Sequence, residues 1–279
     1  MATAMTAIKV TPLTPAIGGL VEGLDFTRPL DVETVRSLHE AWLDRGVLFF
    51  RNTQMDDQQL EDLLGYFGTP IAEPSAGSYG GDPNRRPVHG GDTSRTKGVP
   101  ERWHADATWI EKPPTATVLR MVQPPAPGGG DTLWANVGKA YEDLIEPLRN
   151  LLDHLAAVHW MYPSLAAMNM KGATNNEVEW IHPVVSVHPE TGRKSLFVNE
   201  AWTRAIVELP IDQSMHILAM LYSHIRSPHY SVRWRWAAGD VALWDNRAVQ
   251  HFAVPDYDSP RIIQRAVTAG WKPRGPAGS

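Results

Sequence analysis

Trp103-His104-Ala105-Asp106, taken together with the distant His251, is the part of this chain that most constrains its fold and chemistry. Side chains alternate in direction along an extended segment, so His104 and Asp106 are predicted to point to one face. A second histidine from a distant strand would complete a set of two histidines and one carboxylate. Such a set occupies one face of an octahedron and leaves the opposite face open, which suits non-haem Fe(II) sites that activate O2.

The 279 residues suffice for one large domain or two small ones, and no Ser/Gly-rich or charged linker divides them. We therefore expect a single domain over residues 1–279. An apolar fraction of 43% is ordinary for a soluble globular protein and provides a sizeable core. The net charge is −5 and no long basic run is present, so neither a nucleic-acid partner nor an anionic membrane is expected.

The chain has no cysteine, which excludes disulfides, Fe–S clusters and thiolate catalysis. A metal site must therefore use histidine and carboxylate ligands. Residues 1–12 lack the basic segment and long apolar run of a secretory signal, and no stretch approaches the length of a membrane span. A cytoplasmic enzyme is the simplest expectation.

Periodicity and turn residues predict a mostly β fold with flanking helices. Helices are expected over residues 32–44, 56–68, 136–154 and 212–225. Short strands are expected within residues 8–26 and over 47–50, 115–121, 181–188, 195–199, 231–236, 241–244 and 262–269. Several strands separated by Gly, Pro and Asp turns in the second half predict a sandwich or jelly roll.

The segment from Glu73 to Pro100 is rich in Gly, Pro, Ser, Asp and Arg, and it runs directly into the His104 segment. It is predicted to be a long loop, and long loops in compact domains are often lids or binding elements. An ordinary surface insertion is the alternative. Its place beside the candidate site favours a lid near residues 73–100.

Further stretches complete a pattern that each of them alone would not establish. They are Gly129-Gly130-Asp131-Thr132-Leu133-Trp134, Leu196-Phe197-Val198-Asn199-Glu200, Gly239-Asp240-Val241-Ala242-Leu243-Trp244-Asp245-Asn246-Arg247, Gln250-His251, Arg261 and Arg265. Together with Trp103-His104-Ala105-Asp106, they resemble the TauD/TfdA family of Fe(II)- and 2-oxoglutarate-dependent dioxygenases. The resemblance covers nearly the whole chain, from Ile17 to Arg265.

The resemblance implies a double-stranded β-helix core, that is, a cupin-like jelly roll, with helices buttressing one sheet. It implies that His104, Asp106 and His251 bind Fe(II) and form the catalytic centre. It further implies that Thr132 and Arg261 bind the distal carboxylate of 2-oxoglutarate, which is consumed as a cosubstrate with O2. The family often forms dimers or tetramers, so a homo-oligomer acting on a small-molecule substrate is expected.

The residue types agree with these roles. The planar fork of Arg261 matches a carboxylate through two parallel hydrogen bonds. Arg265 lies four residues further on, so along a strand both side chains are expected to face the barrel interior. Arg265 matches the family arginine that often meets an anionic substrate. Asp245 and Asn246 are expected to brace the turn before His251.

The expected substrate is a small organic anion that is hydroxylated at a C–H bond, with or without subsequent fragmentation. In the sulfonate- and alkyl-sulfate-oxidising branch, a histidine aligned with Glu73 helps to bind the anionic head group. An acid there would repel a sulfonate and favour a cationic or neutral polar group, unless Glu73 points into solvent as most glutamates do. Trp109 and Trp202 are expected to form pocket walls.

Three alternatives stay open. The enzyme could be a sulfonate or alkyl-sulfate dioxygenase proper. Two histidines and an aspartate can also hold Zn²⁺ in a metal-dependent hydrolase, although a hydrolase has no use for a keto-acid clamp made by Thr132 and Arg261. A non-catalytic, cupin-like binding module would have no need of an intact set of His104, Asp106 and His251.

Overall fold

Strand β3 (Val47–Phe50) shows how the main sheet is built, because all four residues are buried while their side chains alternate between two cores. Val47 and Phe49 pack into one core, and Leu48 and Phe50 pack into the other. A strand covered on both faces must be apolar at every position. The structure is a computed structural model that describes residues 8–71, 88–92, 101–161 and 179–276.

The main sheet has eight strands in the order β1-β2-β3-β14-β6-β16-β4, and β5 also pairs with β16. Their bounds are β1 Lys9–Pro12, β2 Gly19–Glu22, β4 Pro70–Ile71, β5 His89–Asp92, β6 Ala116–Gln123, β14 Val241–Asp245 and β16 Ile262–Thr268. Strand β14 lies between β3 and β6 and is antiparallel to both. This central place explains why β14 is fully buried.

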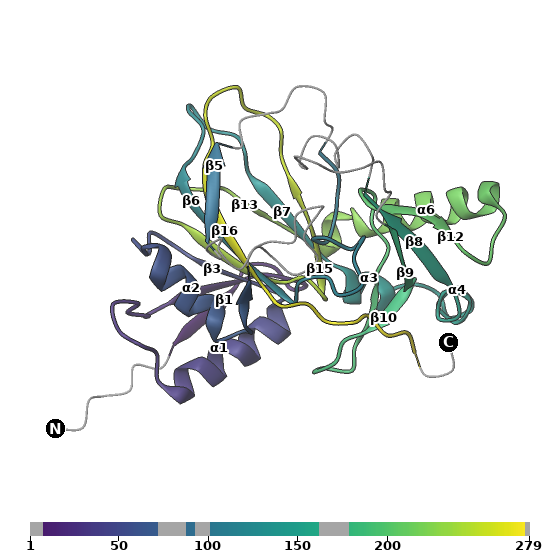
Figure 1. Cartoon of the computed structure of the whole chain (residues 1–279), viewed down its shortest axis with the longest axis horizontal. Coiled ribbons are helices and arrows are strands. Elements are labelled where there is room, and N and C mark those ends of the chain that lie inside the picture. Colours follow the sequence, from purple (N-terminus) through teal and green to yellow (C-terminus); the bar gives the residue numbers. More distant parts are fainter. Residues whose placement is uncertain (1–7, 72–87, 93–100, 162–178, 277–279) are drawn as a thin grey trace.

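Two helices cover the outer face of this sheet (Figure 1). Helix α1 (Val32–Arg45) begins at Asp31, whose side chain accepts from the backbone N–H of Thr34. Helix α2 (Asp57–Gly65) begins with a capping box between Asp56 and Gln59. Leucines of both helices, together with Trp42 of α1, pack in the core that the helices share with the sheet.

A second sheet faces the inner side of the first. It has the order β13-β7-β15, with bounds β13 Ser231–Trp234, β7 Thr132–Asn136 and β15 Val249–Ala253. The core between the sheets is aromatic: Phe49 stacks on Trp234 with ring centroids 4.2 Å apart and meets Trp134 edge-on at 5.2 Å. Trp244 packs in the same core, with its ring centroid 5.7 Å from that of Trp134.

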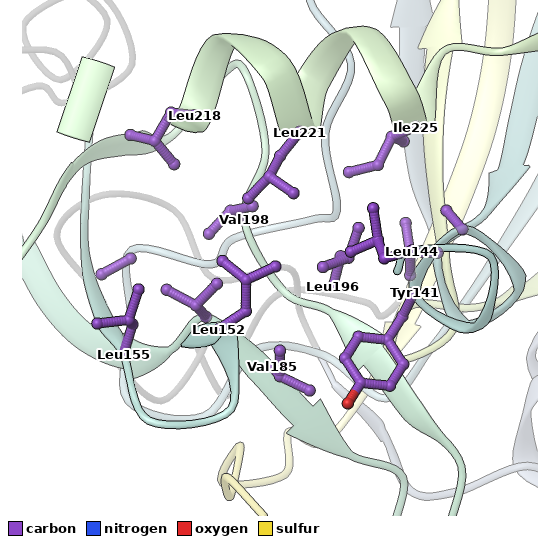
Figure 2. Close-up of a cluster of buried hydrophobic side chains, with 14 of the residues drawn as sticks. Tyr141, Leu144, Leu152, Leu155, Val185, Leu196, Val198, Leu218, Leu221 and Ile225 are labelled. Carbon is purple, nitrogen blue, oxygen red and sulfur yellow. The ribbon is translucent and has the colours of Figure 1, made fainter. Parts of the chain in front are cut away.

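A third layer is made of helices and two small sheets around a separate core that is mostly aliphatic but includes Tyr141 (Figure 2). Its helices are α3 Val137–Glu142, α4 Glu146–Leu152 and α6 Ile211–Ile225, and a 3-10 turn, η1, spans Pro228–Tyr230. Its sheets are β10-β11 and β12-β8-β9, with bounds β8 Ala156–Trp160, β9 Glu179–Pro183, β10 Val185–Val187, β11 Lys194–Leu196 and β12 Thr203–Ile206. Leu218, Leu221 and Ile225 of α6 point into this core.

The mostly β architecture with few helices agrees with the sequence prediction, but several boundaries differ. The single helix expected over residues 136–154 is two helices, because Pro147 lacks an N–H and stands at the start of α4. The strand expected over 181–188 is split between β9 and β10. The predicted loop at 73–100 contains strand β5, and the rest of that segment, including the proposed lid, lies outside the described residues.

The sequence prediction gave no bounds for strands β7, β8, β12 and β15, although it expected His251 to lie on a strand. Each of the four pairs with a strand more than 40 residues away, and such pairing leaves no local pattern. Among the described residues, no helix is both long and apolar enough to cross a membrane.

Candidate active site

His104 and His251 are brought together by the backbone, because they form an isolated antiparallel bridge. The N–H of His104 donates to the carbonyl of His251 at 3.0 Å, and the N–H of His251 donates to the carbonyl of His104 at 2.8 Å. Residues directly opposite each other in such a pair direct their side chains to the same face. The imidazole centroids are accordingly 4.2 Å apart.

Asp106 does not continue the extended segment, contrary to the prediction of a strand-like His-x-Asp. It opens a turn, and Asn246 holds that turn through both backbone groups of Asp106. The N–H of Asp106 donates to Asn246 Oδ1 at 2.7 Å, and Asn246 Nδ2 donates to the carbonyl of Asp106 at 3.0 Å. Asn246 thus braces the aspartate segment, whereas the sequence analysis assigned it to the turn before His251.

The three side chains still meet at one point. Asp106 Oδ1 lies 3.9 Å from His104 Nε2 and 3.7 Å from His251 Nε2, and the three ligand atoms all lie within 4.8 Å of one another. The other carboxylate oxygen, Oδ2, accepts a hydrogen bond from the buried hydroxyl of Thr117 at 2.9 Å. Oδ2 of Asp106 is therefore held by Thr117, while Oδ1 faces the two histidines and Arg265.

The protonation states suit a divalent cation. His104 Nδ1–H donates to the carbonyl of Arg102 at 2.8 Å, so Nε2 is the ring nitrogen that is directed at Asp106. Burial lowers the pKa of His251 to about 3, so this imidazole is neutral near pH 7. Burial alone would raise the pKa of Asp106, but positive Arg265, the neighbouring His251 and His104 and the Thr117 hydrogen bond together outweigh it and hold the pKa below its usual value. Neutral imidazoles and an ionised carboxylate are the donors that Fe(II) accepts.

Thr132 and Arg261 also meet. Arg261 is buried, its Nε donates to the carbonyl of Gly130 at 3.2 Å, and its Nη2 lies 3.5 Å from Thr132 Oγ1. Thr132 begins β7 opposite Ala253, two residues from His251 on β15. Thr132, with the Arg261 side chain beside it, therefore lies along the sheet face that carries His251.

The turn before Thr132 is tightly packed. Gly129 has a φ of +91°, and a Cβ there would lie 2.7 Å from the carbonyl oxygen of Asp256. The N–H of Gly130 donates to Asp256 Oδ1 at 2.7 Å. Glycine is thus required at position 129 both by its backbone conformation and by the close approach of Asp256.

Arg265 reaches the metal-ligand set directly. Its Nη2 lies 3.1 Å from Asp106 Oδ1, and its side chain is 20% exposed. The prediction that both arginines lie on one regular strand is wrong. Arg261 lies one residue ahead of β16, and the pairing register shifts between Ile262 and Ile263. The two arginines contact different residues of the site: Arg261 lies beside Thr132, and Arg265 lies beside Asp106.

The two predicted wall residues lie next to each other on the His104 side of the site. Trp202 meets His104 edge-on at 6.1 Å, and Trp109 meets Trp202 at 4.3 Å. Together with Ala107 and Met161 they belong to one small apolar cluster. Glu73, the fourth predicted substrate residue, lies outside the described residues.

Two further contacts in this site were not expected from the sequence. The first is Thr117 on Asp106, and the second is Trp236, whose Nε1–H donates to Thr132 Oγ1 at 3.0 Å. Thr117 follows the start of a plain apolar strand, and Trp236 is one of 11 tryptophans, so neither had a distinguishing local signal.

Comparison with known proteins gives a consistent result. The family model described as "Taurine catabolism dioxygenase TauD, TfdA family" matches residues 9–267. An alpha-ketoglutarate-dependent sulfate ester dioxygenase from Pseudomonas putida is 39% identical, over 99% of this chain and 94% of that protein. An alkylsulfatase from Acinetobacter baylyi is 34% identical, over 94% of this chain and 85% of that protein.

Solved structures agree with the sequence matches. The structure of a putative alpha-ketoglutarate-dependent taurine dioxygenase from Burkholderia xenovorans superimposes with a TM-score of 0.83 at 33% identity, covering 98% of this chain and 96% of the other. The family match spans both histidines, the aspartate and both arginines of the site described above. This chain therefore belongs to the TauD, TfdA family of dioxygenases.

Proposed function

We propose that this protein is an Fe(II)- and 2-oxoglutarate-dependent dioxygenase that oxidises a C–H bond of a small organic anion. One observation carries the proposal: His104, Asp106 and His251 place three ligand atoms within 4.8 Å of one another in a chain of this family. Iron(II) bound there would activate O2 for oxidation of the substrate, coupled to conversion of 2-oxoglutarate into succinate and CO2.

The protein's own part in this chemistry is to hold ligands and charges in place. His104 Nε2, His251 Nε2 and Asp106 Oδ1 would hold the metal. Thr117 and Asn246 keep Asp106 oriented from opposite ends of the residue. A carboxylate fixed in this way loses little freedom when the metal binds.

Thr132 and Arg261 are proposed to bind the distal carboxylate of 2-oxoglutarate. Burial lowers the pKa of Arg261, which reflects the cost of placing a cation away from water. A carboxylate arriving at this guanidinium would relieve that cost through charge-assisted hydrogen bonds. The hydroxyl of Thr132 would supply a further donor to the same carboxylate.

Arg265, Trp109 and Trp202 are proposed to bind the substrate. Arg265 would provide a cation beside Asp106, and the two indoles would provide apolar walls. The relatives named above as sulfate ester dioxygenase and alkylsulfatase suggest a sulfate ester. Hydroxylation of the carbon that carries the sulfate would give an unstable product, which falls apart into an aldehyde and sulfate.

Glu73 provides a test of this substrate class, because an acid near the head group would oppose a sulfate or sulfonate. The experiment compares kcat/KM for alkyl sulfates and taurine-like sulfonates in wild type and in Glu73→His. Efficient turnover by wild type and no change in the variant would place Glu73 outside the pocket. Poor turnover by wild type with improvement in Glu73→His would favour a zwitterionic or neutral polar substrate.

The proposed reaction class is tested by anaerobic titration with Fe(II) and 2-oxoglutarate. A keto acid bound through two oxygens to iron gives a visible charge-transfer band, which a zinc hydrolase or a non-catalytic binding module would not produce. Asp106→Ala is the control, because it removes both a ligand and the negative charge that offsets the cation. Near-wild-type 2-oxoglutarate decarboxylation by Asp106→Ala would overturn the assignment of the ligands.

The finer architecture is part of the proposal. We assign the main sheet and the β13-β7-β15 sheet to a double-stranded β-helix, because they enclose one aromatic core and carry the candidate site at one end. The chain is proposed to form a single domain with a lid near residues 73–100, and to assemble as a dimer or tetramer. Size-exclusion chromatography with light scattering would test the assembly.

A further inference from the structure

The indole of Trp236 lies against Thr132, one of the two residues proposed to bind the distal carboxylate of 2-oxoglutarate. Its Nε1–H donates to Thr132 Oγ1 at 3.0 Å, and both residues are buried. Trp236 follows the end of β13 and meets Trp134 of β7 with ring centroids 6.1 Å apart, so packing fixes the indole in this position. The hydrogen bond is therefore a set feature of the inter-sheet core.

An indole N–H can donate but cannot accept, so this contact determines how the threonine hydroxyl is used. Thr132 Oγ1 has one hydrogen and two lone pairs, and the indole takes one lone pair. Arg261 Nη2, also a donor with no acceptor capacity, lies 3.5 Å from the same oxygen. The indole contact is the shorter of the two and lies well within hydrogen-bond range, so it dominates.

Because Trp236 and Arg261 both donate towards the lone pairs of Thr132 Oγ1, the hydroxyl must point its own hydrogen away from these two residues. A carboxylate accepts hydrogen bonds and donates none when ionised. We infer that Trp236 is a positioning residue for cosubstrate binding: by donating to Thr132 Oγ1 it turns the threonine hydroxyl into a dedicated donor for the distal carboxylate of 2-oxoglutarate. This inference rests on the proposed function.

The test measures binding of 2-oxoglutarate to protein loaded with Mn(II), by isothermal titration calorimetry, so no turnover is required. Trp236→Phe should weaken binding about tenfold, which corresponds to about 1.4 kcal/mol. Trp234→Phe is the matched control: Trp234 is equally buried in the same core, but its indole N–H has no acceptor among the described residues. Trp234→Phe should leave the affinity for 2-oxoglutarate unchanged.

Two further arms separate positioning from packing. In a Thr132→Val background, Trp236→Phe should cause no additional loss, because the hydroxyl that it orients is gone. With 2-oxopentanoate, which keeps the keto acid but lacks the distal carboxylate, wild type and Trp236→Phe should bind equally. Additive losses in the double variant, or an equal loss with 2-oxopentanoate, would overturn the inference.

If Trp236→Phe fails to fold, 3-benzothienylalanine at position 236 replaces the N–H by sulfur at nearly the same size, and it should show the same loss of affinity for 2-oxoglutarate.

The outcomes also distinguish this inference from the proposed function. A wild-type protein that binds no 2-oxoglutarate would defeat the function itself. A wild type that binds it, with weakening in Thr132→Val but none in Trp236→Phe, would defeat only the role of Trp236.

Discussion

Thr117→Val removes one hydroxyl beside Asp106 and leaves a side chain of nearly the same shape. Thr117 is fully buried, and its hydroxyl donates to Asp106 Oδ2 at 2.9 Å. A hydrogen bond to a charged group contributes about 1.5–3 kcal/mol, so the free energy of unfolding should fall by that amount. A carboxylate without this partner is freer to rotate, and loss of such an outer contact costs about 10–100-fold in metal affinity.

The assay is titration of the metal-free protein with Mn(II), together with urea unfolding. Thr268→Val is the matched control: Thr268 is also fully buried, but its Oγ1 accepts from the backbone N–H of Ala116 at 2.9 Å rather than serving a ligand. Both variants should lose stability, and Thr117→Val alone should lose Mn(II) affinity. Wild-type Mn(II) affinity in a destabilised Thr117→Val would refute the reasoning.

The remaining predictions concern the cosubstrate clamp, the brace on the aspartate segment and pH. Arg261→Ala should raise the apparent KM for 2-oxoglutarate by the equivalent of about 2–5 kcal/mol, with little change in substrate KM; an unaltered value would place the clamp elsewhere. Asn246→Ala deprives both backbone groups of Asp106 of a partner, so urea unfolding should show a loss of about 1–3 kcal/mol for each group, and Mn(II) binding should weaken. Burial lowers the pKa of His159 well below 6.5 and that of His182 to about 4, so the unfolded chain takes up protons first as the pH falls. Stability should be full above about pH 6.5 and decline towards pH 4 by up to about 1.4 kcal/mol per pH unit for each imidazole, and a flat profile in urea unfolding would contradict this.

Elements with a complete local signature were predictable from the sequence. The helix expected over residues 32–44 is α1, which begins after the cap Asp31, and the four apolar residues of β3 were placed at their observed bounds. Both depend on neighbours within a few positions: α1 on its cap, its apolar repeat and the closing Gly46, and β3 on its unbroken apolar run. The prediction of one helix over residues 136–154 was wrong, because the apolar repeat continues through Pro147. The helical backbone does not continue there, since proline lacks the N–H that a continuous helix requires.

The candidate site was predictable to the extent that its chemistry is written in residue types at fixed spacing. His104, Asp106 and His251 were identified from such a pattern, and the structure brings their ligand atoms together. The course of the segment was not predictable: Asp106 lies in a turn because Asn246, 140 residues away, binds its backbone. No local feature of the sequence reports a contact at that separation.

The residues around the ligands follow from strand register rather than from motif. Thr117 lies opposite Trp244 on β14, next to the Asp245-Asn246 turn, so the β6–β14 pairing delivers both the Thr117 and Asn246 contacts to Asp106. A slip of this pairing by one residue would turn Thr117 to the other face of the sheet and remove its contact with Asp106 while every ligand stayed in the sequence. The fully buried apolar run of β14 makes such a slip costly, because it would exchange the residues that face the two cores. The packing that stabilises the main sheet therefore also sets the geometry of the candidate metal site.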